Sequence, residues 1–530
     1  MAPGASLMPG WSGFELDRAN ILQWFPRYGH RPVCFQSPHE FRRVRLTVSD
    51  SQQVLPRAAE DARDIETRRR FADSTAPLRQ KWLSRNSSYH VQRLRLLRKL
   101  VHPGARVLDI GCGTGEFLAA LEPAKGVGLD FSPKMVELAR ARYPGLTFLE
   151  GIAEDLPVSD KFDVVLLGNM MGSLQDVWTA FRQLHKVCDA DTRIIVTYYN
   201  FFWEPLIRLA EYLGLKMAQP RQNWLPLAEI RNNLDLAGFQ SVKHGRHILC
   251  PFNIPVLAGL LNRYIAPLPG IQHLCLEMYT VARLKPRPRD YTVSVVIPCR
   301  NEAANIDPLV ARTPDMGLGT EIIFVDGHST DGTVEKIESA IARAPGGRSI
   351  RLLHQGDGVG KADAVHIGFR QAAGDILMIL DADVTVQPED LPKFYLALAE
   401  GHGEFANGTR LVYPMDDKSM RLLNLLGNKF FSVLLSWLLG QRVRDTLCGT
   451  KVFFRRHYAG IMGIRDTIGR ADPFGDFELL FGASQRNLCI VELPVRYRER
   501  TYGETKISRF RNGWQLLRLC FVVWRRFKLL

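Results

Sequence analysis

The sequence predicts an α/β protein of two domains, each built around a parallel sheet. At 530 residues the chain is too long for one ordinary hydrophobic core. In both halves, short apolar runs of strand length alternate with helical stretches, which is the pattern of parallel sheets. Several of these runs end in an acidic residue or a glycine-rich turn, and ligands of such sheets bind beyond the carboxyl ends of the strands.

The formal net charge of +14 is concentrated at the two ends of the chain. Residues 1–100 hold 18 Lys and Arg against 9 Asp and Glu, and residues 496–530 hold 10 against 2. Basic ends favour a membrane surface or phosphate groups over duplex DNA, although a solvated basic surface has the same composition. The nine cysteines are scattered without a C-x-x-C pair, which is typical of a reducing compartment and argues against structural zinc. We expect neither a signal peptide nor a transmembrane helix.

The first hundred residues divide into two stretches. Residues 1–57 are rich in Pro, Arg and Ser and lack a sustained period, so we expect a poorly ordered basic extension. From residue 58 to residue 100 the pattern is helical and basic, and it ends at His102-Pro103-Gly104, a helix stop.

A candidate binding loop follows the apolar strand in RVLDIGCGTGEFLAAL, residues 106–121. Gly111, Gly113 and Gly115 let the backbone turn tightly and approach a ligand, and the helix that follows presents free N–H groups. The spacing is G-x-G-x-G and not the G-x-G-x-x-G of dinucleotide folds, and Asp109 precedes it. An acid at this position would repel a pyrophosphate but suits a ligand with sulfonium and ammonium charges.

Asp130 ends the next apolar strand, where an acid can accept hydrogen bonds from ribose hydroxyls. Residues 58–285 resemble the class I S-adenosylmethionine-dependent methyltransferases. The resemblance implies a Rossmann-like fold that binds the cofactor through the glycine loop, Asp109 and Asp130, with Ala153 and Glu154 on the adenine side. Ile152 departs from the family, which commonly has an Asp there. A scaffold that binds the cofactor or nothing remains an alternative, and no residue identifies the methyl acceptor.

Residues 286–291 form a Pro-interrupted charged linker, and a second domain is predicted over 292–530. It opens with a β-branched strand and a turn that contains Pro298, Arg300 and Glu302. The later stretch EIIFVDGHSTDGT repeats this format and has Asp326 at the end of its strand.

The stretch ILMILDADVTVQPEDL, residues 376–391, ends a buried strand with two carboxylates, Asp381 and Asp383. Alternation along an extended chain would place both on the same side. Two acids at the end of a buried strand are costly unless a cation lies between them. A solvated strand-end turn is the simpler alternative for an isolated D-x-D pair.

The strand-end acids, the D-x-D pair and the Pro–Arg–Asn–Glu turn resemble family 2 glycosyltransferases of the GT-A fold. Within that family the second half is most similar to the dolichol- or polyprenol-phosphate sugar transferases. The resemblance implies that Asp381 and Asp383 hold Mg²⁺ or Mn²⁺ against the donor diphosphate. Thr385 stands where related enzymes often have Gln, which leaves a third protein ligand open. The implied nucleotide-sugar-binding residues are Pro298, Arg300, Glu302, Asp326, Lys361 and Asp381.

The same resemblance implies an acceptor that is a lipid phosphate. Such a phosphate is already an anion and needs cations instead of a base, and the implied acceptor-side cations are Arg410, Arg421, Arg444 and Lys506. Arg444 and Lys506 are assigned to catalysis as well. Asp476 is open to two interpretations, because family members that glycosylate a hydroxyl use an Asp near this point as the base.

Two segments favour attachment to a membrane surface. In residues 421–440, the polar residues Asn424, Asn428, Ser432 and Ser436 form one narrow stripe on an apolar helix, which favours an in-plane helix over one buried against the sheet. The C-terminal helix is basic, amphipathic and rich in tryptophan, which suits an anionic lipid surface. We therefore expect a bifunctional enzyme that is cytoplasmic and peripherally attached to the inner face of the membrane.

Overall fold

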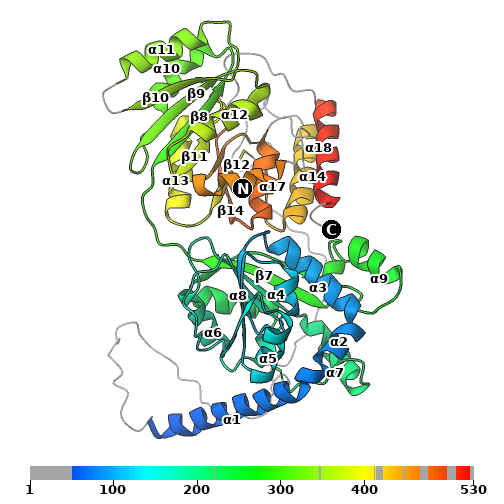
Figure 1. Ribbon diagram of the computed structural model, residues 1–530. Helices are drawn as coiled ribbons and strands as arrows, with labels where there is room; N and C mark the ends of the chain where they lie inside the picture. The colour runs from blue at the N-terminus through cyan, green and yellow to red at the C-terminus, as the bar shows by residue number, and fades with distance from the viewer. Residues whose placement is uncertain are drawn as a thin grey trace, which may run out of the picture. The chain divides into compact units, whose positions relative to one another are not determined.

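The computed structural model describes residues 51–220, 222–344, 348–410, 412, 422–445, 448–465, 475–497 and 509–525. Within these residues the chain forms two seven-stranded sheets that belong to one compact unit beginning at Glu60 (Figure 1). The irregular extension predicted over residues 1–57 lies outside the described residues as far as residue 50. For residues 51–57 the prediction is wrong, because they begin the helix α1, Ser51–Thr75. No helix in the described ranges is long and apolar enough to cross a membrane.

The first sheet has the strand order β3-β2-β1-β4-β5-β7-β6, in which β7 runs antiparallel to both of its neighbours. Its strands are β1 Arg106–Ile110, β2 Lys125–Asp130, β3 Thr147–Glu150, β4 Val164–Gly168, β5 Arg193–Tyr199, β6 Phe239–His247 and β7 Glu277–Leu284. The helices of this half are α1 Ser51–Thr75, α2 Arg79–Arg85, α3 Ser87–Leu100, α4 Glu116–Ala120, α5 Pro133–Arg142, α6 Val177–Gln183, α7 Glu204–Tyr212, α8 Leu227–Leu236 and α9 Leu257–Leu260. The helical pattern predicted for residues 58–100 is confirmed as three helices.

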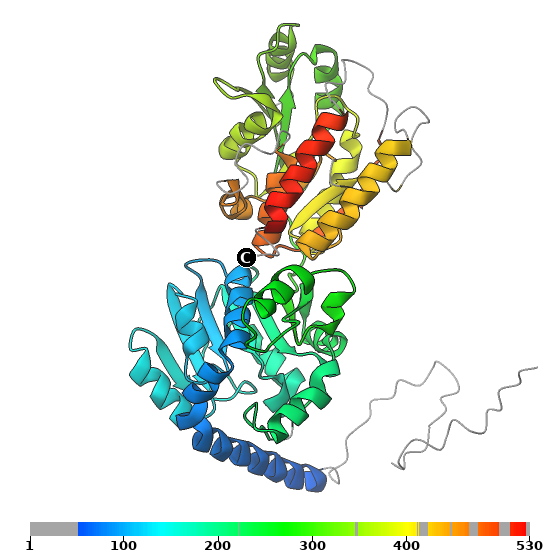
Figure 2. The same cartoon turned by 90° about the vertical axis from the view of Figure 1, so that its right-hand side faces the viewer.

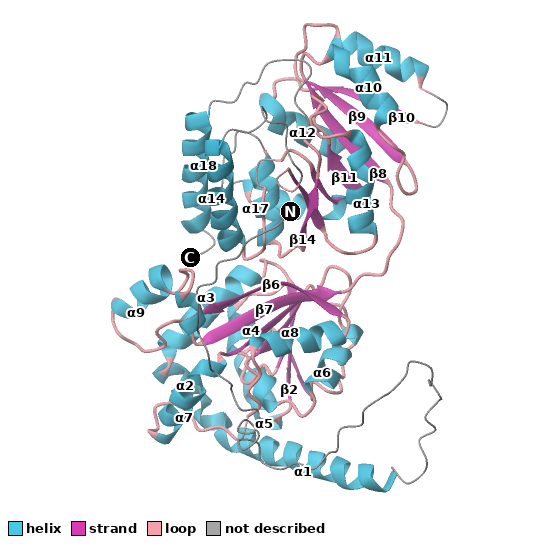
Figure 3. Cartoon of the chain, turned by 180° about the vertical axis from the view of Figure 1, so that it is seen from behind, coloured by secondary structure: helices cyan, strands magenta, loops and turns pink. Residues whose placement is uncertain are grey.

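The second sheet, whose strands β8 to β11 are labelled in Figure 3, has the order β10-β9-β8-β11-β13-β12-β14. Strand β13 runs antiparallel to both of its neighbours, β11 and β12. Its strands are β8 Val293–Cys299, β9 Thr320–Asp326, β10 Ser349–His354, β11 Ile376–Ile379, β12 Phe405–Thr409, β13 Lys451–Phe454 and β14 Ile490–Pro494. Its helices are α10 Ala303–Arg312, α11 Thr333–Arg343, α12 Gly360–Gln371, α13 Leu391–Ala399, α14 Leu422–Leu439, α15 Tyr458–Met462, α17 Asp476–Gln485 and α18 Arg509–Trp524.

Each sheet is buried on both faces, as the runs of apolar residues predicted. Strand β11 shows the reason most simply, because its side chains alternate between two cores. Leu377 and Ile379 pack in the core that contains residues of α12, α14, α17 and α18. Ile376 and Met378 pack in the opposite core with residues of α10, α11 and α13. All four side chains are at most 1% exposed.

The last strand of the first sheet ends at Leu284 and the first strand of the second sheet begins at Val293. The segment between them has no regular secondary structure. The predicted linker over residues 286–291 falls in this interval. The domain boundaries at 57, 285 and 291 stay predictions, and the two mainly parallel α/β folds are observed.

Candidate active sites

Parallel pairing aligns three strand ends of the second sheet. Cys299 at the end of β8 pairs with Asp326 at the end of β9, and Asp326 pairs in turn with His354 at the end of β10. Gly327 N donates to Cys299 O at 2.8 Å, and Gln355 N donates to Asp326 O at 2.9 Å. The turn after β8, which carries the predicted nucleotide-binding residues, therefore lies beside Asp326.

Side chains of the next loop hold this turn in place. Asn301 has φ +58°, its N–H donates to Ser329 Oγ at 3.0 Å, and its side-chain oxygen accepts from Thr330 N at 2.9 Å. Ser329 N donates to the buried Asp326 carboxylate at 3.3 Å. Of the predicted residues on the turn, Pro298 and Glu302 are half-buried and Arg300 is exposed. Hydrogen bonds therefore join the two loops into one edge that carries acidic and polar groups.

Lys361 draws two acidic residues together at the same edge. Its Nζ lies 2.6 Å from Asp381 Oδ1 and 4.0 Å from Asp476 Oδ2. Burial alone would lower the pKa of Lys361, but Asp381 and Asp476 outweigh burial and raise that pKa above its ordinary value. Burial raises the pKa of Asp381; Lys361 opposes the rise and Asp383 adds to it. The side chains come from α12, the segment after β11, and the first residue of α17.

Gly449 closes against this ion pair and was not singled out from the sequence. A Cβ at this position would lie 2.2 Å from Asp381 Oδ2 and 2.6 Å from Lys361 Nζ. The sequence feature that could have indicated it is the glycine within the motif RVRDTLCGTK. Because no side chain fits there, the backbone of Gly449 can approach the carboxylate directly.

Asp381 and Asp383 lie in a turn and not on an extended chain. The strand ends at Ile379, Val384 N contacts Asp381 O at 3.3 Å, and Val384 has φ +54°. The extended backbone that the alternation argument assumed is therefore absent at this pair. Thr385 donates to Asp383 Oδ1 from its N at 3.1 Å and its Oγ1 at 2.8 Å, which fixes that carboxylate. Two neighbouring half-buried carboxylates are a donor set that fits Mg²⁺ or Mn²⁺.

Asp476 is the first residue of α17 and is 6% exposed. Two residues along this helix, Glu478 contacts His366 Nε2, and His366 Nδ1 lies 3.0 Å from the Tyr458 hydroxyl. These contacts tie α17 to α12 and α15. Asp476 is thus held beside Lys361 by a buried polar connection between three helices.

The four predicted acceptor-side cations differ in their exposure and in their partners. Arg410 contacts both oxygens of the fully buried Asp445, at 2.7 and 2.9 Å, so its guanidinium already has a carboxylate partner. Arg444 is exposed, and its backbone N donates to Glu492 Oε1 at 2.7 Å. Arg421 and Lys506 lie outside the described residues. The acceptor-side roles stay predictions for all four.

The glycine loop of the first sheet has the backbone that its sequence predicted. Gly111, Gly113 and Gly115 have φ of +77°, +57° and +82°, which side chains rarely tolerate. Gly113 N donates to Asp130 Oδ2 at 2.8 Å, and Ser132 N donates to Asp130 Oδ1 at 3.0 Å. Burial raises the pKa of Asp130, and these two N–H groups oppose the rise. The carboxylate of Asp130 thereby joins the loop after β1 to the loop after β2.

Asp109, near the end of β1, is 4% exposed. Burial raises its pKa to about 7, with Arg93 opposing the rise and Asp130 adding to it. Arg79 of α2 opposes it too, and a Cβ at Gly113 would lie 2.7 Å from Arg79 Nη2. Charge on Asp109 is therefore poorly compensated without a ligand, and a cationic ligand would favour its ionised form.

The predicted adenine-side segment lies after β3. Ala153 is buried, and Glu154 Oε1 accepts from Gln175 N at 2.9 Å in the loop after β4. Helix α1 also contacts these loops, since Asp64 Oδ2 accepts from Gln175 Nε2 at 2.7 Å and Asp73 Oδ1 accepts from Ser132 Oγ at 2.5 Å. The N-terminal helix therefore packs on the edge of the sheet that carries the glycine loop.

A buried polar group at the ends of β5 and β7 was missed in the sequence. Tyr199 pairs with Glu277 across these strands, and Arg93 Nε lies 3.3 Å from Glu277 Oε1. Arg93 Nη2 donates to Thr197 Oγ1 at 3.4 Å. Burial raises the pKa of Glu277 to about 7, against the opposing effect of Arg93. In the sequence, Arg93 is one of many arginines in a basic helix, so nothing marked it as buried.

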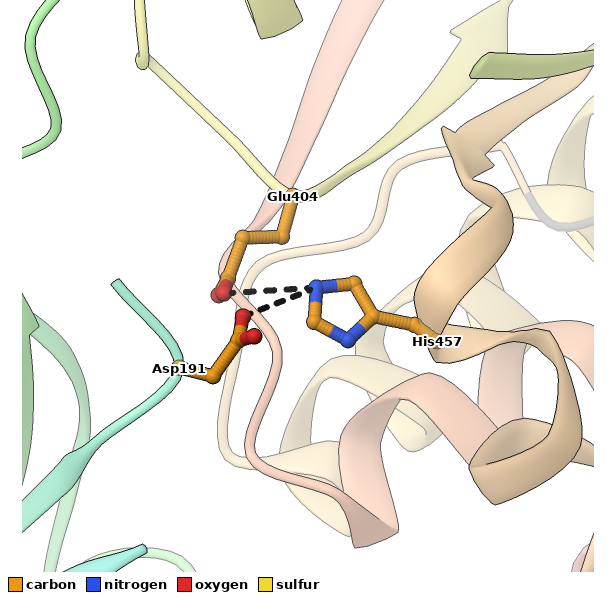
Figure 4. A group of neighbouring side chains, drawn as sticks. All are labelled: Asp191, Glu404 and His457. Atoms are coloured by element: carbon orange, nitrogen blue, oxygen red, sulfur yellow. Dashed lines mark ion pairs between the residues drawn. The ribbon is translucent and has the colours of Figure 1, made fainter. Parts of the chain in front are cut away.

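Asp191, Glu404 and His457 place ligand-type atoms within 4.8 Å of one another (Figure 4). The two carboxylates already have cationic partners, because Glu404 Oε1 lies 2.7 Å from Arg193 Nη2 and Asp191 Oδ1 lies 3.0 Å from Arg456 Nε. Burial lowers the pKa of His457 to about 4. The group is therefore an ion-pair cluster of residues that lie outside the strands, and we assign no metal to it.

Two family models match the chain in the regions of these two sites. The model described as a glycosyl transferase family 2 matches residues 294–461, and the model described as a methyltransferase domain matches residues 108–196. The first range contains the turn after β8, Lys361 and the D-x-D pair. The second contains the glycine loop and Asp130.

Curated relatives match the second half of the chain. A dolichol-phosphate mannosyltransferase of Pyrococcus furiosus is 28% identical over 220 residues, which cover 41% of this chain and 59% of that protein. A dolichol-phosphate mannosyltransferase of Saccharomyces cerevisiae is 38% identical over 122 residues, covering 22% and 44%. An undecaprenyl-phosphate 4-deoxy-4-formamido-L-arabinose transferase of Pseudomonas aeruginosa is 29% identical over 244 residues, covering 45% and 65%. The chain thus spans less than two thirds of each relative.

Among solved structures, a SAM-dependent methyltransferase from Thermotoga maritima is similar at 19% identity and a TM-score of 0.33, covering 40% of this chain and 98% of that one. We draw no conclusion from a TM-score this low. The conclusion about the two domains rests on the family models and on the two sheets with their strand-end sites. The chain therefore matches a methyltransferase domain on its first sheet, which is a Rossmann-like α/β sheet, and a family 2 glycosyltransferase domain on its second sheet.

Proposed function

We propose that the protein is a bifunctional transferase. The second domain transfers a sugar, with inversion, from a nucleotide-sugar donor to a polyprenyl-phosphate-type lipid acceptor. The first transfers a methyl group from S-adenosylmethionine to an acceptor whose identity is open. The observation that carries the sugar-transfer proposal is the contact of Lys361 with Asp381 and Asp476, next to Asp383. The names of the lipid-phosphate sugar transferases among the relatives support the acceptor class.

The donor would bind along the edge formed by β8, β9 and β11. Pro298, Arg300, Glu302 and Asp326 would contact the nucleoside, and Asp381 and Asp383 would hold Mg²⁺ or Mn²⁺ at the diphosphate. When bound, such an ion offsets charge on the departing nucleotide diphosphate. Lys361 favours the ionised form of Asp381 against the effect of burial, and Thr385 fixes the orientation of Asp383.

The acceptor phosphate is an anion at neutral pH, so its oxygen can attack the anomeric carbon without a base. The bond from that carbon to the diphosphate breaks as the new bond forms, and a single displacement inverts the configuration. The protein must then supply cations that bring two anions together, and Arg444, Arg421 and Lys506 are assigned to this task. Arg410 is a weaker candidate because Asp445 engages its guanidinium.

A hydroxyl acceptor is the second candidate, with Asp476 as the general base. Its support is the position of Asp476, which is buried beside Lys361 at the same strand edge. In that alternative the methyltransferase domain would serve as a non-catalytic, cofactor-binding scaffold.

One pair of variants decides between the two acceptors. A hydroxyl nucleophile needs the base, which typically contributes about 10²–10⁴-fold in rate. With a lipid phosphate we expect Asp476→Asn to lose little rate and Arg444→Ala to lose most of it. The assay is transfer from radiolabelled sugar nucleotides to a short-chain polyprenyl phosphate in detergent, with thermal melting as the control for folding. An opposite ranking of the two variants would refute the lipid-phosphate acceptor.

The methyltransferase part has a separate test. Full-length protein should melt at a higher temperature with S-adenosylmethionine, and the shift should grow with cofactor concentration. The variant Gly113→Ala should abolish the shift, because a Cβ there meets Arg79 and the residue has φ +57°. An unchanged melting temperature of the wild-type protein with S-adenosylmethionine would refute cofactor binding.

We also place the protein at the cytoplasmic face of the membrane, attached through α14 and α18. The solvent side of α18 presents Trp514, Leu517 and Phe521, interleaved with Arg518 and Arg525. A helix with aromatic and basic residues on its exposed side suits the surface of an anionic bilayer. On α14, Ser432 and Ser436 of the predicted polar stripe both donate to Val443 O, so these two residues face the protein.

A further inference from the structure

The segment between β6 and β7, residues 250–275, presents apolar side chains to solvent although it belongs to the methyltransferase half. Side chains with exposed fractions between 36% and 78% include Phe252, Ile254, Val256, Leu257, Leu260 and Ile265. The segment has no Asp or Glu and one Arg. Single exposed apolar residues need no explanation, but a contiguous group of this kind marks an interaction site.

The outward apolar side chains belong to a fixed conformation. The buried side chain of Asn262 accepts from Leu249 N and Cys250 N, both at 2.8 Å, and donates to Cys250 O at 2.7 Å. Ala258 and Ala266 are buried on the inner side of the segment. The small residues therefore face the protein and the large apolar ones face solvent, which is the reverse of an ordinary surface segment.

This segment continues the exposed side of the two glycosyltransferase helices. Trp437 Nε1 of α14 donates to Pro267 O at 2.6 Å, and the ring of Trp524 of α18 lies 6.5 Å from that of Tyr264. Figure 2 looks onto α14 and α18, which lie side by side, with the segment that contains α9 near the lower end of α14. Phe430 and Val433 of α14 are 56% and 66% exposed.

The charges of the three segments have a single sign. Residues 250–275, 421–440 and 509–530 together contain nine Lys and Arg and no Asp or Glu. The whole chain has 55 Asp and Glu in 530 residues, so stretches of this combined length would ordinarily hold several. Apolar and aromatic side chains with interspersed cations, and no acids, match the interface of an anionic bilayer better than the surface of a protein partner.

We propose that residues 250–275 are a membrane-docking element of the methyltransferase domain, which binds an anionic lipid surface together with α14 and α18. The inference rests on the proposed membrane attachment and extends it to the other domain. The methyltransferase domain then contacts the bilayer directly, so both active sites belong to one membrane-bound unit. Multiple weak contacts from three segments of one chain add to a stable attachment.

The test is flotation of the full-length protein with vesicles of phosphatidylcholine that contain about 30% phosphatidylglycerol. The protein concentration is held at ~1 μM, well below the lipid concentration, because binding to a surface is weak. The double variant Leu257→Asp, Leu260→Asp should partition at least tenfold more weakly than wild type. The matched control is Leu236→Asp on α8, where the leucine is 66% exposed and lies outside the segment. This control should float like wild type.

A second pair, Phe252→Asp with Ile254→Asp, guards against misfolding of α9, and thermal melting of every variant is compared with wild type. Flotation of both double variants at the wild-type level would overturn the proposal, as would a wild-type protein that does not float. A dimer in light scattering that either double variant dissociates would also overturn it, because the occupant would then be a second copy. Sugar transfer to short-chain polyprenyl phosphate in detergent is measured alongside. Its absence in wild type would refute the proposed function, whereas loss of flotation alone in the double variants supports docking by the segment.

Discussion

Replacing Glu404 by Gln should strongly destabilise the protein, because this carboxylate joins the two domains. Glu404 is fully buried and precedes β12 of the second sheet. Its Oε1 lies 2.7 Å from Arg193 Nη2 of β5, and its Oε2 lies 3.5 Å from Arg283 Nη1 of β7. Its Oε2 also accepts from Cys489 N at 2.9 Å. One carboxylate thus compensates two buried guanidinium groups of the first sheet.

The magnitude follows from the pKa of this group. Burial alone would raise the pKa of Glu404, but Arg193 and Arg283 outweigh burial and lower it from 4.5 to about 2. At about 1.4 kcal/mol per pKa unit, ionisation stabilises the folded state by roughly 3 kcal/mol. Loss of one partner of a buried ion pair typically costs about 3–5 kcal/mol, since the remaining charge stays buried. We therefore expect Glu404→Gln to lower the free energy of unfolding by about 3–5 kcal/mol.

The pH dependence gives an independent check. Because the folded pKa of Glu404 lies below the unfolded value, its stabilisation is present above pH 4.5 and is lost as the pH falls toward 2. The assay is urea denaturation followed by tryptophan fluorescence and circular dichroism, with midpoints compared because two domains can unfold separately. Asp191→Asn is the control, since Asp191 is 55% exposed and its ion pair is worth about 1 kcal/mol or less. An unchanged midpoint for Glu404→Gln at pH 7, or a difference from wild type that persists at pH 2, would refute the reasoning.

Three further predictions concern the two active sites. Asp383→Asn should abolish sugar transfer while S-adenosylmethionine still raises the melting temperature, because hard cations prefer a charged carboxylate; full activity with Mg²⁺ or Mn²⁺ would remove Asp383 from the metal site. Gly449→Ala should reduce sugar transfer at least a hundredfold, since its Cβ would lie 2.2 Å from Asp381 Oδ2, and a wild-type rate in the radiolabel assay would contradict that close approach. The pKa of about 7 for Asp109 predicts that S-adenosylmethionine affinity falls below pH 7, as the acid must lose its proton to pair with the cationic cofactor. Calorimetry at pH 6 and pH 8 measures this, and Asp109→Asn should have a pH-independent affinity.

Much of each site could be predicted from single stretches of sequence. The glycine loop needs three residues with positive φ, and only glycine adopts that backbone cheaply, so the loop is visible in the sequence. Asp130, Asp326 and the D-x-D pair could be found because each follows a buried strand, and parallel strands deliver their carboxyl ends to one edge. The turn at Val384 could not be foreseen, since it depends on a backbone hydrogen bond and not on the alternation of side chains.

Contacts between segments that are distant in the sequence could be identified only from the tertiary structure. The sequence by itself determined the two α/β domains, the strand-end acids and the glycine loop, because local apolar runs and glycine positions encode them. It could not show that Lys361 lies between Asp381 and Asp476, or that Arg193 and Arg283 share Glu404 across the two sheets. An arginine or lysine has the same local pattern whether it is solvated or buried. Its role is set by which carboxylate the tertiary structure places within a few ångströms, where loss of water makes that charge strong.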